Sequence, residues 1–240
     1  MLYKTRGIVF RTIKYSDNSS ITILFTEQFG LRTYMIKGLG GKKSSLKKGA
    51  IQNLNLLNLV VYEKEKNNLQ TIREIENVIP YQKIPFDIRK TSVLMFLNEL
   101  LYHSVKEEAA NHDLFNFIFN GLLMFDEMET GTENFHLQFA VGLTRYLGIY
   151  PRNNYSENNR FFDLQEGVFV HDEPFHTNFL NKELSQKLSQ MQIGVEYNQH
   201  LFMNAAARNE LLERLLLYYK LHIPSFGEIK SHRVLKDVLA

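Results

Sequence analysis

The stretch that decides the fold is GIVFRTIKYSDNSSITILFTEQFGLRTYMIK, Gly7 to Lys37, near the start of the 240-residue chain. The turn cluster YSDNSS and the triplet Gln28-Phe29-Gly30 divide it into three runs that are rich in β-branched and aromatic residues. Runs of this composition between turn residues predict β-strands over residues 7–13, 21–26 and 31–37.

Two further runs, residues 51–62 and 69–78, predict a fourth and a fifth strand. Five short strands in about 80 residues, with one long connection between the third and the fourth, suit a small Greek-key barrel such as an OB-fold. An open five-stranded sheet is the alternative that the same pattern allows. We expect a β-domain over residues 1–80.

Pro80 and Pro85 mark a change to helical spacing of the apolar residues. This spacing predicts helices over residues 87–106, 113–128, 132–147, 181–191, 204–221 and 231–239. Residues 151–179 are irregular and rich in Asn, and their segment FFDLQEGVFV is predicted to form a short hairpin. The expected fold class is α+β: an N-terminal OB-fold barrel, then an all-α domain over 81–240 with a cysteine-free insertion at about 151–179.

The composition excludes several kinds of site. The chain has no cysteine, which removes disulfides, thiol nucleophiles and thiolate zinc sites. Its apolar run at residues 53–61 falls far short of the roughly 18 residues that a membrane span needs. The N-terminus lacks the unbroken apolar core of a signal peptide. We expect a cytoplasmic protein with no membrane partner.

Positive charge is concentrated in the first third of the chain. Residues 1–80 carry 13 Lys and Arg against 6 Asp and Glu, whereas residues 81–240 carry 15 against 20. No acid lies between Glu27 and Glu63. This asymmetry indicates a basic module made for a polyanion. A lysine-rich face that only contacts solvent explains a single loop equally well.

The most basic segment is KGLGGKKSSLKKG, Lys37 to Gly49. It does not fit a Walker A loop, because only two residues separate Gly38 from Gly41 where four are needed, and Lys42 is followed by Lys43. It also lacks the spacing of a dinucleotide-binding loop. The chain has no G-x-S-x-G elbow, no H-E-x-x-H pair and no histidine pair at i, i+4. The sequence therefore predicts no catalytic residue, no metal site and no cofactor.

A nucleic-acid contact fits the segment better, since lysines on a glycine-rich loop can follow a phosphate backbone without reading base sequence. Arg32 and Tyr34 share one face of the preceding strand and would pair a cation with a stacking ring. The ring of Tyr34 fits the barrel core equally well.

Three passages of the chain resemble the bacterial DNA-repair protein family RecO. They are TRGIVFRTIKYSDNSSITILFTEQFGLRTYMIKGLGGKKS, FAVGLTRYLGIYPRNN and LLERLLLYYKLHIPSFGEIKSHRVLKDVL, and they occur in the family's order and spacing. Many members carry a four-cysteine zinc module after the middle helices. This chain departs there, so zinc is not carried over, and we expect Phe161, Phe162, Val168 and Phe169 to hold that region by packing.

The resemblance implies a DNA repair and recombination mediator with no enzymatic activity, located in the cytoplasm with the nucleoid. Such a protein binds single- and double-stranded DNA, anneals complementary strands and, with RecR, helps to load RecA onto strands coated by single-strand-binding protein. It contacts the C-terminal tail of that protein, and RecF and RecA are indirect partners. The DNA-binding residues that match the family's basic loop are Lys37, Lys42 and Lys43, with Arg32 beside them.

Charge placement alone adds further candidates to this DNA-binding set. They are Lys47, Lys48, Arg6 and Arg11, with a second basic patch at Lys230, His232 and Arg233. Two other classes of function remain open at this point. One is a different OB-fold module, associated with RNA or the ribosome, whose helical domain docks a protein. The other is an enzyme whose site the sequence hides.

Overall fold

The structure, a computed structural model, describes residues 1–37, 48–64, 68–77, 80–193 and 201–240. These residues form two compact units that are not consecutive in the sequence. The first comprises Met1–Gln82 with Val105–Leu123, and the second comprises Lys83–Ser104 with Met124–Ala240. We call residues 37–49 the basic loop, and its residues Lys42, Lys43 and Lys47 lie outside the described residues.

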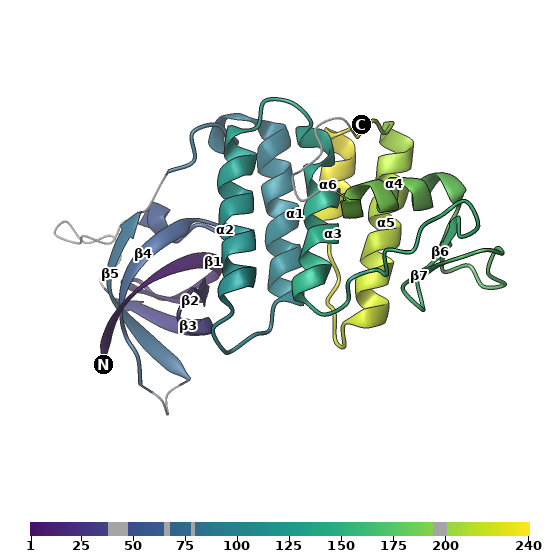
Figure 1. Ribbon diagram of the computed structural model, residues 1–240. Helices are drawn as coiled ribbons and strands as arrows, with labels where there is room; N and C mark the ends of the chain where they lie inside the picture. The colour runs from purple at the N-terminus through teal and green to yellow at the C-terminus, as the bar shows by residue number, and fades with distance from the viewer. Residues whose placement is uncertain (38–47, 65–67, 78–79, 194–200) are drawn as a thin grey trace. The chain divides into compact units, whose positions relative to one another are not determined.

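The first unit contains a closed barrel of five strands, seen in Figure 1. Its strands are β1 (Leu2–Ser16), β2 (Ser19–Thr26), β3 (Gly30–Lys37), β4 (Leu56–Tyr62) and β5 (Leu69–Asn77). Around the barrel they follow the order β1-β2-β3-β5-β4, and β3 pairs with β5 in parallel while the other pairs are antiparallel. This is a Greek-key OB-fold barrel, and the predicted fold class is confirmed.

The predicted fourth strand begins too early. Ile51 belongs to a 3-10 helix, η1 (Lys48–Ile51), and Leu54 has a left-handed backbone with φ of 60°, so that β4 starts only at Leu56. Ile51 is nevertheless buried and packs against the barrel core. The residue is apolar because it packs there, and not because it occupies a pleated strand.

The barrel core follows the period-two alternation of its strands. Its buried side chains are contributed by all five strands and by η1: Val9, Leu24, Tyr34, Ile36, Ile51, Leu57, Leu59, Val61, Ile72 and Ile75. On β1 the pairing with β2 skips from Val9 to Arg11, so Phe10 is an extra residue in the ladder. Such a β-bulge bends a strand and increases its twist.

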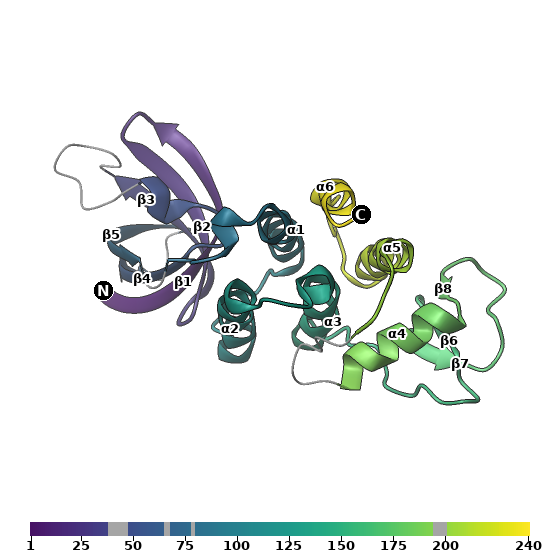
Figure 2. The ribbon, with the colours of Figure 1, turned by 90° about the horizontal axis from the view of Figure 1, so that it is seen from above.

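Six α-helices lie in the described ranges. They are α1 (Ile88–Ser104), α2 (His112–Glu127), α3 (Phe135–Tyr146), α4 (Lys182–Ile193), α5 (Ala205–His222) and α6 (Ser231–Val238), with short 3-10 helices η2 (Ile84–Phe86) and η3 (Thr132–Asn134). Figure 2 looks along α1, α3, α5 and α6 of the second unit, so that they appear end-on. In these ranges no helix combines the length and apolar character that crossing a membrane requires. The helical segments predicted from apolar spacing are confirmed.

A buried lysine closes the C-terminal end of α2. The ammonium of Lys90 donates hydrogen bonds to the carbonyl oxygens of Phe125, Asp126 and Met128 at 2.9, 2.7 and 2.7 Å. These carbonyls have no partner within their own helix. Burial is the main influence on this lysine and lowers its pKa. The contact ties α1 to the end of α2 within the second unit.

The insertion contains the predicted hairpin. Strands β6 (Phe161–Asp163) and β7 (Val168–Val170) pair antiparallel, and β8 (Phe179–Leu180), which the sequence did not predict, adds to β6. Phe162 and Phe169 are buried, with ring centroids 4.8 Å apart, while Phe161 and Val168 are half-exposed.

Candidate nucleic-acid interface

The outer face of β1, β2, β3 and β5 is a mainly apolar surface. The strand register places Arg11, Ile23, Thr33 and Leu69 in one row across the four strands. The next row contains Ile13, Ile21, Met35 and Thr71. Because alternate residues of a strand point to the same side, these eight side chains share the outside of the barrel. We call this surface the outer sheet face.

Several apolar side chains of the outer sheet face are open to solvent. Ile13 is 46% exposed and Leu69 is 41% exposed, while Ile21, Ile23 and Met35 are half-buried. Tyr15, two residues beyond Ile13, is 66% exposed and is the aromatic ring at the β1–β2 end of this face. A surface of this kind offers van der Waals contact to sugars and bases and one ring for stacking.

Cations border this apolar surface. Arg11 lies in its first row, Lys14 follows Ile13 in the hairpin, and Lys37 ends β3 as an exposed residue. Lys14 makes an ion pair with Asp17 at 2.9 Å, which leaves it a weaker ligand for a phosphate. Lys37 is also the first residue of the basic loop, and the loop's far end returns to the barrel as the backbone of Lys48 in η1. The basic loop thus begins and ends at the barrel, starting from β3 of the outer sheet face.

Tyr34 lies on the opposite side of β3 from this surface. Its ring is fully buried in the barrel core, and its hydroxyl donates a hydrogen bond to the carboxylate of Glu63. Burial raises the pKa of Tyr34 well above its ordinary value. A ring without an exposed face cannot stack on a base, so the stacking role predicted for Tyr34 does not fit its position.

Arg32 shares this orientation and lies near the start of β3. Its Nη1 donates to the carbonyl oxygens of Glu108 at 2.6 Å and of its neighbour Leu31 at 3.1 Å. The backbone approaches closely here, since Gly30 has φ of +68° and a Cβ on it would lie 2.2 Å from the Ala109 carbonyl oxygen. Arg32 therefore joins two segments of the first unit, and it does not point toward the outer sheet face.

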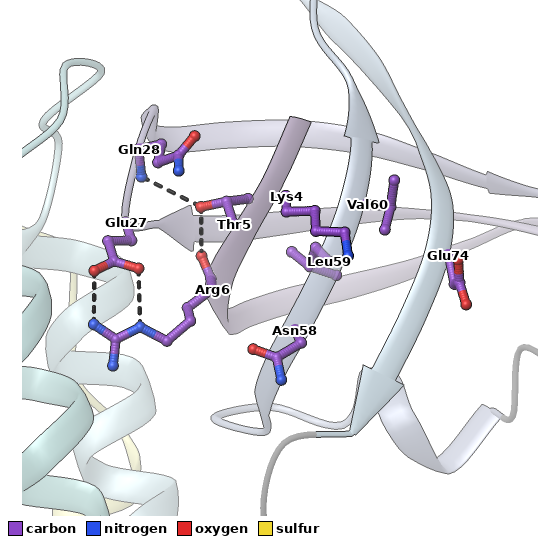
Figure 3. Close-up of a pocket in the computed structure, with 9 residues that line it drawn as sticks. All are labelled: Lys4, Thr5, Arg6, Glu27, Gln28, Asn58, Leu59, Val60 and Glu74. Carbon is purple, nitrogen blue, oxygen red and sulfur yellow. Dashed lines mark hydrogen bonds and ion pairs between the residues drawn. The ribbon is translucent and has the colours of Figure 1, made fainter. Parts of the chain in front are cut away.

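Arg6 is engaged in a structural ion pair, drawn in Figure 3. Its Nε and Nη2 contact the carboxylate of Glu27 at 2.9 and 2.6 Å, and Nη2 also donates to Asn116 at 3.1 Å. The guanidinium lies over the rings of Phe115 and Phe119, at 5.2 and 4.7 Å from their centroids. The hydrogen bond with Glu27 is the largest influence that raises the pKa of Arg6.

The second basic patch is placed at the start of α6. Lys230 and Arg233 are exposed, and Arg233 lies 3.8 Å from the carboxylate of Glu228. Nδ1 of His232 lies 2.7 Å from the carbonyl oxygen of Ile229, and because that oxygen only accepts, Nδ1 carries the hydrogen. The three residues are close in space because they are close in sequence, and acids are interspersed with them.

Beside this patch is a hollow of about 310 Å³ in the second unit. Leu216, Leu217 and Phe226 provide apolar lining, and Lys220 and His232 lie at its border. Two acids also line it, but Glu213 lies 3.7 Å from Lys236 and Glu228 lies near Arg233.

Within the described ranges, no three His, Asp or Glu side chains gather as a group that could hold a metal ion. His176 lies 3.1 Å from the carboxylate of Asp163, and His171 lies 3.9 Å from that of Asp172. The expectations that the chain needs no metal and no cofactor stay predictions.

The sequence pattern could have revealed part of the outer sheet face. Arg11, Ile13 and Tyr15 alternate with Thr12 and Lys14, which is the period-two signature of one strand face. Ile13 and Tyr15 were not among the predicted site residues because charge, rather than alternation, guided that choice. The bulge at Phe10, which decides where this face begins, has no signal in the sequence.

The strand order, the single parallel pairing and the cation-bordered outer face define the class: an OB-fold protein joined to a helical domain. Comparison with known families is consistent with this class. The family models "Recombination protein O N terminal" and "Recombination protein O C terminal" match residues 1–81 and 85–232. The chain belongs to the recombination protein O (RecO) family.

Curated relatives agree with this over the full length. The DNA repair protein RecO of Phocaeicola vulgatus is 33% identical over 241 residues, covering 100% of both chains. That of Azobacteroides pseudotrichonymphae is 33% identical over 239 residues, covering 99% of both. That of Flavobacterium johnsoniae is 32% identical over 243 residues, covering 100% of both. Membership of this family supports a role in DNA repair and recombination.

Proposed function

We propose that the protein is a recombination mediator that binds single- and double-stranded DNA and anneals complementary strands. With RecR, it helps to load RecA onto DNA coated by single-strand-binding protein, and RecF is a further, indirect partner. It acts in the cytoplasm, with the nucleoid, and makes or breaks no covalent bond. The observation that carries the proposal is the outer sheet face, in which aliphatic side chains and Tyr15 are bordered by Arg11 and Lys37.

This face can hold a strand mainly by its backbone. Cations at the border neutralise phosphates and release counterions, which makes binding strong at low salt and insensitive to base sequence. The aliphatic rows present few hydrogen-bonding groups that could read a base edge. Only Tyr15 contributes an exposed ring among the described residues of this face, so the bases are not captured by extensive stacking. Bases that stay available can pair with a second strand, which is what annealing requires.

The hollow beside α6 supports a docking place for the C-terminal tail of single-strand-binding protein. A peptide that combines acidic residues with an apolar side chain matches apolar lining bordered by Lys220 and His232. Replacing Lys220 by Glu is expected to weaken binding of a labelled tail peptide at least about fivefold, measured by fluorescence anisotropy. R160E, an exposed charge reversal in the insertion, is the control. An equal loss of peptide affinity in both variants would contradict binding of the tail in this hollow.

The test of the function is a fluorescence annealing assay with two complementary strands, each coated with single-strand-binding protein, in the absence of nucleotide. We expect the protein to accelerate annealing of coated strands, and RecR to promote RecA loading in a parallel assay. An RNA-binding module would bind strands without accelerating their annealing. Absence of any acceleration across salt concentrations would contradict the proposal.

A further inference from the structure

A second outer surface of the barrel is formed by β1, β4 and β5. The register places Lys4, Val60 and Glu74 in one row across these strands, and Leu2, Tyr62 and Thr71 in the next. A groove of about 390 Å³ lies on this side, lined by the first of these rows together with Arg6, Glu27 and Asn58 among others (Figure 3). We call this surface the charged face.

Lys4 on β1 and Glu74 on β5 place opposite charges on the two sides of the charged face. Figure 3 shows Val60 between Lys4 and Glu74. Both charged side chains are exposed, and among the described residues neither has a hydrogen-bond or ion-pair partner. Strand β4 separates their strands, and among the described residues the two side chains do not form an ion pair with each other.

The centre of the charged face is apolar. Leu2 and Tyr62 are each 44% exposed, and Val60 is half-buried between the two charges. The neighbouring pair of Arg6 and Glu27 is already satisfied internally. The surface therefore presents an apolar centre at Val60 and Tyr62 of β4, with one unpaired cation on the β1 side and one unpaired anion on the β5 side.

We propose that the charged face binds the same face of a second copy of this chain, about a two-fold axis that runs along β4. Such an axis exchanges the β1 and β5 sides, so that Lys4 of each copy lies opposite Glu74 of the other. Val60 and Tyr62 lie on the axis and meet their own counterparts. Sheets that pack face to face in this way lie about 10 Å apart, a separation that these side chains fill.

The dimer is weak and concentration-dependent, because three short strands bury less area than a stable dimer needs. Its consequence for DNA rests on the proposed function. The charged face and the outer sheet face share only Thr71 on β5, so dimerisation leaves the rest of the outer sheet face of each copy open. Two copies then carry two strands in one particle, which raises the rate at which complementary strands meet.

Sedimentation equilibrium of the full chain tests the dimer. We expect K4E and E74K, each alone, to raise the dimer dissociation constant at least about tenfold. In each variant the residues at positions 4 and 74 carry the same charge, and the two-fold axis brings them together in two equivalent contacts. An equimolar mixture of K4E and E74K is expected to form a heterodimer of wild-type strength, because both pairs are restored with exchanged partners. R160E and E157K, matched reversals at exposed positions of the insertion, are expected to leave the constant unchanged.

A wild-type chain that stays monomeric at its highest soluble concentration overturns the proposal, and so does a mixture that fails to recover. Binding of a short single strand by K4E and E74K is expected to match the wild type, while annealing is slower for each and recovers in the mixture. If the wild type dimerises as described but anneals nothing, the proposed function fails and the dimer stands.

Discussion

The two halves of β1 present two arginines that look alike in the sequence and differ in the structure. Arg6, before the bulge at Phe10, is held by Glu27, Asn116 and two phenylalanine rings. Arg11, after the bulge, lies in the first row of an exposed apolar face. The first arginine is part of the packing of the barrel, and the second lies on the face that we propose binds DNA.

The neighbours of the two arginines differ in the same way. Next to Arg6, the outward residues Ile8 and Phe10 are buried, and Phe10 stacks on Phe25 with centroids 5.9 Å apart. Next to Arg11, the outward residues Ile13 and Tyr15 are exposed. Counting cations along the strand would assign both arginines to DNA. The contacts that hold Arg6 in the barrel are not visible in such a count.

The largest effect is expected from the basic loop that follows Lys37 in the sequence. Replacing Lys42, Lys43, Lys47 and Lys48 by Ala is predicted to weaken single-strand binding on the order of a hundredfold at low salt. The salt slope, which is the slope of the logarithm of the binding constant against the logarithm of the salt concentration, is predicted to fall in magnitude by up to about 3. Fluorescence anisotropy at several salt concentrations measures both. The matched control removes four lysines from the helices: Lys182, Lys187, Lys220 and Lys236. An unchanged slope in the loop variant would remove the loop from the DNA site.

The second prediction separates the two arginines directly. Arg6→Ala removes a bidentate ion pair and leaves Glu27 partly buried without its partner, so we expect about 2 kcal/mol lower unfolding free energy. Binding of DNA by the folded variant should stay within about twofold of the wild type. Arg11→Ala is the matched variant, and it should lose more affinity for DNA than Arg6→Ala does. Denaturant unfolding measures the stability of each variant, and fluorescence anisotropy measures its affinity for DNA. A larger loss of DNA affinity in Arg6→Ala than in Arg11→Ala would contradict the comparison.

Tyr15 provides the third prediction, on the exposed half of the strand. Tyr15→Ala is expected to weaken single-strand binding by about 1 kcal/mol, the lower end of the range for a base stacked on an aromatic ring. The salt slope should not change, because no charge is removed. Tyr15→Phe is the control that keeps the ring. A loss of affinity in the Phe variant as large as in the Ala variant would argue against stacking.

The sequence predicts the fold of this chain well because its signals are local. Alternation and turn residues locate the barrel strands, and apolar spacing locates helices such as Asn204-capped α5. The predicted strand at residues 51–62 is wrong in its first part because Ile51 is buried as part of η1, a non-local fact. The third strand of the insertion sheet, β8, is only two residues long and gives no pattern.

The candidate site is predicted less completely because exposure depends on tertiary structure. Arg32 and Tyr34 were correctly placed on one face of β3, but only barrel closure determines that this face points inward. Similarly, the partner of Arg6 is Glu27, twenty-one residues away, and its other contact is Asn116. The sequence shows that these residues are basic or aromatic, but it does not show which side of the barrel they occupy.

The smallest effect concerns the pH dependence of the ion pair between Arg6 and Glu27. Hydrogen bonding from Arg6 lowers the pKa of Glu27, so the stability that this pair provides is complete above the ordinary carboxyl value of about 4.3 and is lost as the pH falls through the lower folded-state value. Glu27→Gln should therefore be less stable than the wild type at pH 7, and the difference should shrink at pH 3, by less than about 1 kcal/mol because the pair is partly exposed. Glu157→Gln, at an exposed position, should show no such change. A difference between Glu27→Gln and the wild type that grows on acidification would mean that Glu27 is protonated in the native barrel and does not form the ion pair with Arg6.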